Sequence, residues 1–123
     1  MILVDTSVWV EHLRKGDAIL VGLLGGGRVL AHPFVTGEIA LGNLRQREMI
    51  LGALKDLPQA LIAGDDEVLG FIEQSALSGL GIGYVDAHLL AAVRLTPGAS
   101  LWTHDKRLSG AAENLGLAAN LNL

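Results

Sequence analysis

The feature that most constrains the fold is a short apolar run that ends directly on a helix-starting triplet. The run Ile2-Leu3-Val4 does not alternate with polar residues, which predicts a strand buried on both faces, as in parallel sheets. The triplet Asp5-Thr6-Ser7 follows at once, and each of these side chains can cap a helix N-terminus. Helical spacing then continues to Lys15, and Gly16 supplies a stop signal. The chain therefore opens with a strand joined directly to a helix.

The same arrangement of a strand followed by a helix recurs along the sequence. A strand at 28–31 precedes a helix that opens at Pro33, runs to about residue 44 and breaks near Arg45, and a strand at 100–103 precedes a helix at 106–115. Further helices are expected at 18–24, 46–56, 65–76 and 84–95, with a possible short strand at 60–63 and a final strand or tail at 118–123. Alternation of this kind predicts an α/β fold with a parallel sheet covered on both faces.

Composition narrows the class of protein. With 123 residues, half of them apolar, we expect a single globular domain over 1–123. The absence of cysteine excludes disulfides, thiolate zinc sites and cysteine nucleophiles. Apolar runs are too short to cross a membrane, and charged residues follow the apolar start, so we expect a cytoplasmic protein. The net charge of −4, from 13 acids and nine Lys and Arg, argues at first against a nucleic-acid partner.

Four acids occupy the positions where α/β proteins place their chemistry. Asp5 and Asp105 follow two of the predicted strands, while Glu38 and Asp86 lie in the first turns of two helices. Each acid taken alone is explained as a helix cap, a first-turn acid or a solvated side chain. Together they outnumber their Lys and Arg neighbours, and oxygen ligands without cysteine suit Mg²⁺ or Mn²⁺. Such clusters catalyse phosphodiester hydrolysis.

Four segments, in order, resemble PIN-domain proteins, especially the VapC toxins of bacterial toxin–antitoxin pairs. They are Ile2-Leu3-Val4-Asp5-Thr6-Ser7-Val8-Trp9, Val35-Thr36-Gly37-Glu38-Ile39-Ala40, Gly81-Ile82-Gly83-Tyr84-Val85-Asp86-Ala87 and Leu101-Trp102-Thr103-His104-Asp105-Lys106-Arg107-Leu108. Each motif is weak by itself, but four in the right order are specific. The resemblance covers essentially the whole chain.

The resemblance implies a three-layer α/β/α sandwich with a short, mainly parallel sheet, and a ribonuclease that uses one or two Mg²⁺ or Mn²⁺ ions. Transferred residue by residue, Asp5, Glu38 and Asp86 would be the metal ligands, and Asp105 a fourth acid that binds directly or through water. Metal-activated water would cleave RNA to a 5′-phosphate and a 3′-hydroxyl. The resemblance also implies a homodimer and a VapB-like antitoxin whose C-terminal segment covers the active site.

Several neighbouring residues are candidates for supporting roles. Thr6, Ser7 or Thr103 could orient a carboxylate or a metal-bound water, and the sequence does not say which. Arg45 and Arg47 are the candidates for contacts with RNA phosphates. The four histidines, and the tryptophans at 9 and 102, are interpreted as structural. Without an obvious aromatic platform, we expect RNA recognition to depend on shape and backbone.

Three alternatives remain at this stage. A non-catalytic α/β interaction module would use the same acids only as caps. An RNase H-like nuclease also has an acidic metal cluster, but its sheet begins with antiparallel hairpins, whereas here a helix signal follows the first acid. A haloacid dehalogenase-type enzyme would need an aspartate two residues after Asp5, where this chain has Ser7.

The net charge can also be interpreted differently. Without the four candidate ligands, nine acids balance the nine Lys and Arg, so the whole −4 can belong to one metal site.

Overall fold

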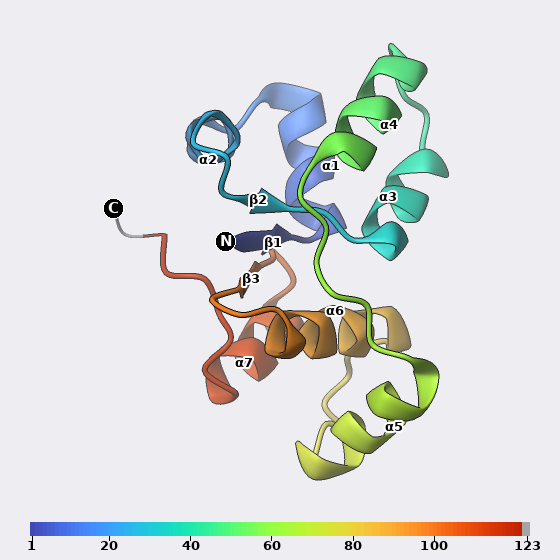
Figure 1. The fold of residues 1–123 in the computed structure, drawn as a ribbon, viewed down its shortest axis with the longest axis vertical. Coiled ribbons are helices and arrows are strands. Elements are labelled where there is room, and N and C mark those ends of the chain that lie inside the picture. The colour runs from blue at the N-terminus through green and yellow to red at the C-terminus, as the bar shows by residue number, and fades with distance from the viewer. Residues whose placement is uncertain (122–123) are drawn as a thin grey trace.

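The computed structural model describes residues 1–121, and a three-stranded parallel sheet lies at its centre (Figure 1). The strands are β1 (Ile2–Val4), β2 (Val29–Leu30) and β3 (Ser100–Trp102), in the order β2-β1-β3. Ile2 pairs with Val29 on one side and with Ser100 on the other. All three residues of β1 are buried, as the unbroken apolar run predicted.

Helices cover both faces of the sheet, so the expected three layers are confirmed (Figure 1). One layer holds α1 (Thr6–Lys15), α2 (Ala18–Gly25), α3 (Pro33–Ala40) and α4 (Arg47–Asp56). The other holds α5 (Asp65–Gln74), α6 (Tyr84–Leu95) and α7 (Lys106–Asn114). The parallel strand pairs and the helix directly after β1 exclude the RNase H-like arrangement.

Local sequence signals explain where most of the helices begin. The side chains of Asp5, Asp17 and Asp105 cap α1, α2 and α7, respectively, by accepting backbone N–H bonds. Pro33 occupies the first turn of α3, where a missing N–H costs nothing. Gly16 ends α1 with a φ of 79°, a conformation that glycine adopts without strain.

The helix expected at 33–44 is shorter than predicted, because α3 ends at Ala40 and α4 starts at Arg47. The Arg47 guanidinium donates hydrogen bonds to the carbonyl oxygens of Ala40 and Gly42. It therefore satisfies carbonyls that the end of α3 leaves free, a tertiary contact that periodicity does not reveal.

Residues 60–63 do not form the possible strand. The chain meets the sheet only at Gln59, which makes an isolated parallel bridge with Ala31. It then turns away, because the Leu61 amide donates to the Thr96 hydroxyl instead of continuing the ladder.

The C-terminal segment gives a bridge rather than a strand, since Ala118 pairs with Leu101 alone. Residues 122–123 of the predicted strand or tail lie outside the described residues. The helix expected at 65–76 ends at Gln74.

Candidate active site

The carboxylate of Asp5 lies where β1, α1 and β3 meet, and only 7% of the residue is exposed. Its Oδ1 accepts the Thr6 amide at 2.8 Å. Its Oδ2 accepts the hydroxyls of Thr103 at 2.7 Å and Ser7 at 3.1 Å. These three donors offset the cost of burying a carboxylate and fix its orientation.

Glu38 reaches the same place from α3. The Thr6 hydroxyl, at the start of α1, donates to Glu38 Oε1 at 2.6 Å. Thr6 therefore links two of the predicted ligands, since its amide binds Asp5 and its hydroxyl binds Glu38.

Asp86 lies in the first turn of α6, where its Oδ2 accepts the Gly83 amide at 2.9 Å. Burial raises the pKa of this carboxyl above its ordinary value, and the Gly83 hydrogen bond partly offsets the rise. The negative charges of Asp5, Asp105 and Glu38 raise the pKa further. Asp86 therefore lies near enough to the other three predicted acids to be affected by their charges.

Asp105 caps α7 with its side chain and is joined to Asp5 through one threonine. Its Oδ1 accepts the Leu108 amide at 3.0 Å. Its own amide donates to Thr103 Oγ1, the same hydroxyl that binds Asp5. Ser7 adds another link, because its hydroxyl accepts the His104 amide at 3.0 Å.

The carboxylates keep capacity for a cation. In residues 1–121, Glu38 Oε2, Asp86 Oδ1 and Asp105 Oδ2 accept no hydrogen bond, while the other oxygen of each acid is held by the protein. No three acids or histidines of this described part are close enough together to form a finished metal site. The all-oxygen donor set and the mutual repulsion at Asp86 nevertheless fit Mg²⁺ or Mn²⁺.

The four histidine side chains contact groups other than the four acids, and His104 Nε2 lies 3.8 Å from Glu11 Oε2. His12 and His32 accept backbone amides through Nδ1, from Asp17 and Phe34 respectively. His88 is buried against the rings of Phe34 and Tyr84, each at 4.7 Å between centroids. Its Nε2 is 3.3 Å from Asp65 Oδ1 but lacks hydrogen-bond geometry. Both tryptophans are buried, as expected.

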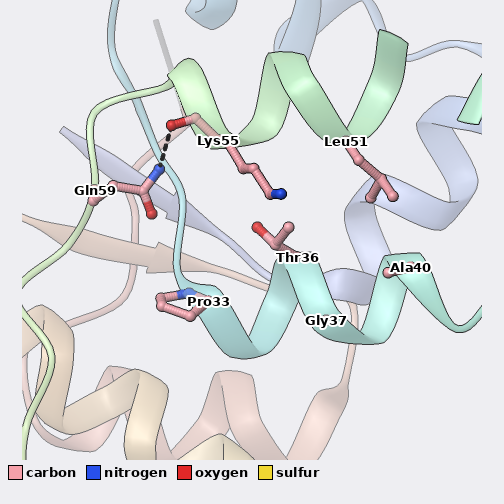
Figure 2. Close-up of a pocket in the computed structure, with 7 residues that line it drawn as sticks. All are labelled: Pro33, Thr36, Gly37, Ala40, Leu51, Lys55 and Gln59. Atoms are coloured by element: carbon pink, nitrogen blue, oxygen red, sulfur yellow. Dashed lines mark hydrogen bonds between the residues drawn. The ribbon is translucent and has the colours of Figure 1, made fainter. Parts of the chain in front are cut away.

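Two hollows adjoin α3 on different faces. A groove of about 880 Å³ contains Glu38 and Arg45 and runs between α1 and α4. A smaller pocket of about 420 Å³ is lined by Pro33, Thr36, Gly37, Ala40, Leu51, Lys55 and Gln59 (Figure 2). Helical spacing places the α3 residues of this pocket on the face away from Glu38, so it is separate from the acidic cluster.

Comparison with known proteins decides the family. No model of a known protein family matches the chain. Ribonuclease VapC32 of Mycobacterium tuberculosis, from strain CDC 1551/Oshkosh and from strain H37Rv, is 51% identical over 118 residues. The match spans 96% of this chain and 95% of the relative. The chain belongs to the VapC family of PIN-domain ribonuclease toxins.

Membership in the VapC family confirms the resemblance found in the four sequence segments. The VapC fold brings Asp5, Glu38, Asp86 and Asp105 to one edge of the sheet, while Thr6, Ser7 and Thr103 bind carboxylates directly. Sequence reasoning missed the Gly83 amide that holds Asp86. The signal for it was glycine three residues before an acid at a helix start. No helix within residues 1–121 is long and apolar enough to cross a membrane.

Proposed function

We propose that this VapC-family protein is an endoribonuclease toxin that hydrolyses RNA phosphodiesters with Mg²⁺ or Mn²⁺ held by Asp5, Glu38 and Asp86. The observation that carries the proposal is the hydrogen-bond network in which Thr6 links Asp5 to Glu38 and Thr103 links Asp5 to the Asp105 backbone. The 51% identity to a named ribonuclease supports it independently.

The chain's own residues supply a rigid frame for this chemistry. Ser7 and Thr103 fix Asp5, Thr6 fixes Glu38, and the Gly83 amide fixes Asp86, so each acid presents its carboxylate in a set direction. One or two divalent cations held by these acids would activate water and neutralise charge on the phosphate. The water oxygen would form a bond to phosphorus as the bond to the 3′ oxygen breaks, and the 3′ oxygen would take up the proton that the water releases, so the products are a 5′-phosphate and a 3′-hydroxyl. Asp105 is the fourth acid of the site.

The test is cleavage of a structured RNA by the purified protein with Mg²⁺, with Mn²⁺ and with chelator. Asp5→Asn and Asp86→Asn should each abolish cleavage, because both remove a charged ligand and keep the shape of the side chain. Asp17→Asn is the matched control, since Asp17 caps α2 and lies outside the cluster. Full activity in both active-site variants would contradict the proposal and favour a non-catalytic interaction module.

The expected antitoxin has a suitable surface beside the site. The groove between α1 and α4 contains Glu38 and exposes the apolar side chains of Val10, Leu13 and Met49. A VapB-like segment lying there would cover Glu38. Met49→Glu should prevent co-purification with a co-expressed VapB-like antitoxin, and retention of the complex would place the segment elsewhere.

The remaining expectations are a homodimer and a cytoplasmic location. Leu61, Ile62 and Leu69 are each more than half exposed around the start of α5, and burial of this apolar surface in a second copy would stabilise a dimer. Sedimentation of Ile62→Asp should show a monomer, and an unchanged dimer would exclude this apolar surface.

Arg45 and Arg47 remain the candidates for contacts with RNA. Arg45 lines the groove that contains Glu38, and Arg47 also donates a hydrogen bond to the end of α3.

A further inference from the structure

The side chain of Arg107 packs against the backbone of Gly81. A Cβ added at Gly81 would lie 2.6 Å from Nη1 and 2.9 Å from Cδ of Arg107, closer than atoms tolerate. Gly81 also has a φ of +77°, which side chains rarely adopt. The positive φ favours glycine here, and an added Cβ would displace the exposed end of the Arg107 side chain.

This contact joins the two segments that carry Asp86 and Asp105. Arg107 follows Asp105 by two residues, in the first turn of α7. Gly81 precedes Gly83 by two residues, and the Gly83 amide holds the Asp86 carboxylate. The Arg107 side chain therefore packs against the loop that leads to Asp86, from the helix that Asp105 caps.

Nothing in the fold accounts for a cation at this position. The N-terminal turn of a helix carries partial positive charge, so Lys106 and Arg107 are unfavourable there. Within residues 1–121 the exposed Arg107 guanidinium makes no hydrogen bond and no ion pair.

We propose that Arg107 binds an RNA phosphate beside the scissile bond and that Gly81 holds the guanidinium in place, a role that rests on the proposed nuclease function. The planar guanidinium matches two phosphate oxygens, as a fork of parallel N–H donors. A polyanion that approaches four carboxylates also gains from a nearby cation. Arg107 is a substrate-binding residue in this scheme, and Gly81 is a positioning residue.

Binding of RNA is measured apart from cleavage, by fluorescence anisotropy in Ca²⁺ buffer. The probe is a labelled, random-sequence RNA of about 20 nucleotides, titrated across about 50–200 mM KCl. Arg107→Ala should bind about tenfold more weakly, and the slope of log Kd against log salt should fall by about 0.7, the value for one phosphate contact on a single strand. Arg107→Lys should restore the slope but only part of the affinity, since the charge returns without the fork.

Gly81→Ala should reproduce the change in slope, because the new methyl group displaces the guanidinium. Gly79→Ala is the matched control: its φ is +78°, so the backbone strain is similar, but nothing lies within 4 Å of its added Cβ. An unchanged slope in Arg107→Ala would overturn the phosphate site. An unchanged slope in Gly81→Ala, or an equal loss in Gly79→Ala, would overturn the positioning role of Gly81.

Cleavage in Mg²⁺ separates this proposal from the proposed function. If the protein binds the probe through Arg107 but never cleaves RNA, the phosphate site is supported and the nuclease assignment is contradicted. If the protein cleaves RNA but Arg107→Ala does not change binding, the nuclease assignment is supported and the phosphate site is contradicted.

Discussion

Asp5 and Asp105 each serve as a helix cap and as part of the acidic cluster. One oxygen of each carboxylate accepts an amide at the start of its helix, from Thr6 and from Leu108 respectively. Capping leaves other lone pairs of the carboxylate free. The capping interpretation and the ligand interpretation therefore do not compete at these positions.

Asp86→Asn should raise the melting temperature of the metal-free protein. The raised pKa means that ionised Asp86 is less favourable in the folded protein than in the unfolded chain. Asparagine removes the charge and can still accept the Gly83 amide through its side-chain oxygen. Calorimetry in chelator should show the variant melting a few degrees higher; an equal or lower melting temperature would contradict this.

The same pKa sets the pH dependence of that difference. Below the ordinary value of 3.8 the carboxyl is protonated in both states, so the two proteins should differ little. As pH rises through 3.8 and then through the raised folded pKa, the wild type loses stability relative to Asp86→Asn. Above that window the difference should be constant.

His32 should make the fold sensitive to acid in the opposite direction. Burial, with a contribution from His88, lowers its pKa from 6.5 to about 4. The folded protein therefore favours the neutral ring, and stability should fall as pH drops from 6.5 towards 4, by up to about 1.4 kcal/mol per pH unit. His32→Asn retains an acceptor for the Phe34 amide and should remove this component in urea titrations. An identical pH profile in the variant would exclude His32 as the source.

At the scale of elements, hydroxyl groups fasten the ends of the strands to the starts of the helices. Thr103, just after β3, binds Asp5 at the end of β1, and Thr6, at the start of α1, binds Glu38 of α3. These bonds cross between elements 32 and 98 residues apart in sequence. The same hydrogen bonds therefore hold the elements together and fix the geometry of the site.

Thr103→Val should lower metal affinity or RNA cleavage by about 10–100-fold, because Asp5 loses its shortest side-chain donor. The stability of the fold should fall much less, by about 1 kcal/mol. Thr36→Val is the control, since Thr36 lines the pocket on the other face of α3 (Figure 2). Cleavage and Mn²⁺ titrations of the two variants provide the comparison, and equal behaviour would remove Thr103 from the site.

For the whole molecule, the net charge of −4 is concentrated by the fold. Four acids that are far apart in sequence lie at one edge of the sheet, which makes that edge negative. On the proposed function, cations bound at this edge would allow an acidic protein to accept RNA.

Mn²⁺ should therefore stabilise the folded protein, since binding to the folded state alone shifts the unfolding equilibrium. At a concentration about 100-fold above Kd the gain is about 2.7 kcal/mol, visible as a higher melting temperature. The double variant Asp5→Asn/Asp86→Asn should lose this response, while Asp17→Asn should keep it. An equal rise in all three proteins would show that Mn²⁺ acts elsewhere.

The sequence by itself determined the features that depend on neighbours along the chain. The apolar run at 2–4 predicted a strand correctly, and the capping residues at 5 and 105 and the periodicity at 84–95 predicted three helices correctly, because caps and side-chain periods are local effects. The order of the four acidic motifs was also sufficient to indicate the family.

Tertiary structure alone decided which groups touch. It assigned Ser7 and Thr103 to Asp5 and Thr6 to Glu38, a choice that the sequence left open. It also ended α3 at Ala40, where Arg47 folds back onto free carbonyls, and it turned residues 60–63 away from the sheet. These outcomes depend on hydrogen bonds whose partners come together only after the helices have packed on the strands. Local sequence patterns therefore cannot predict them.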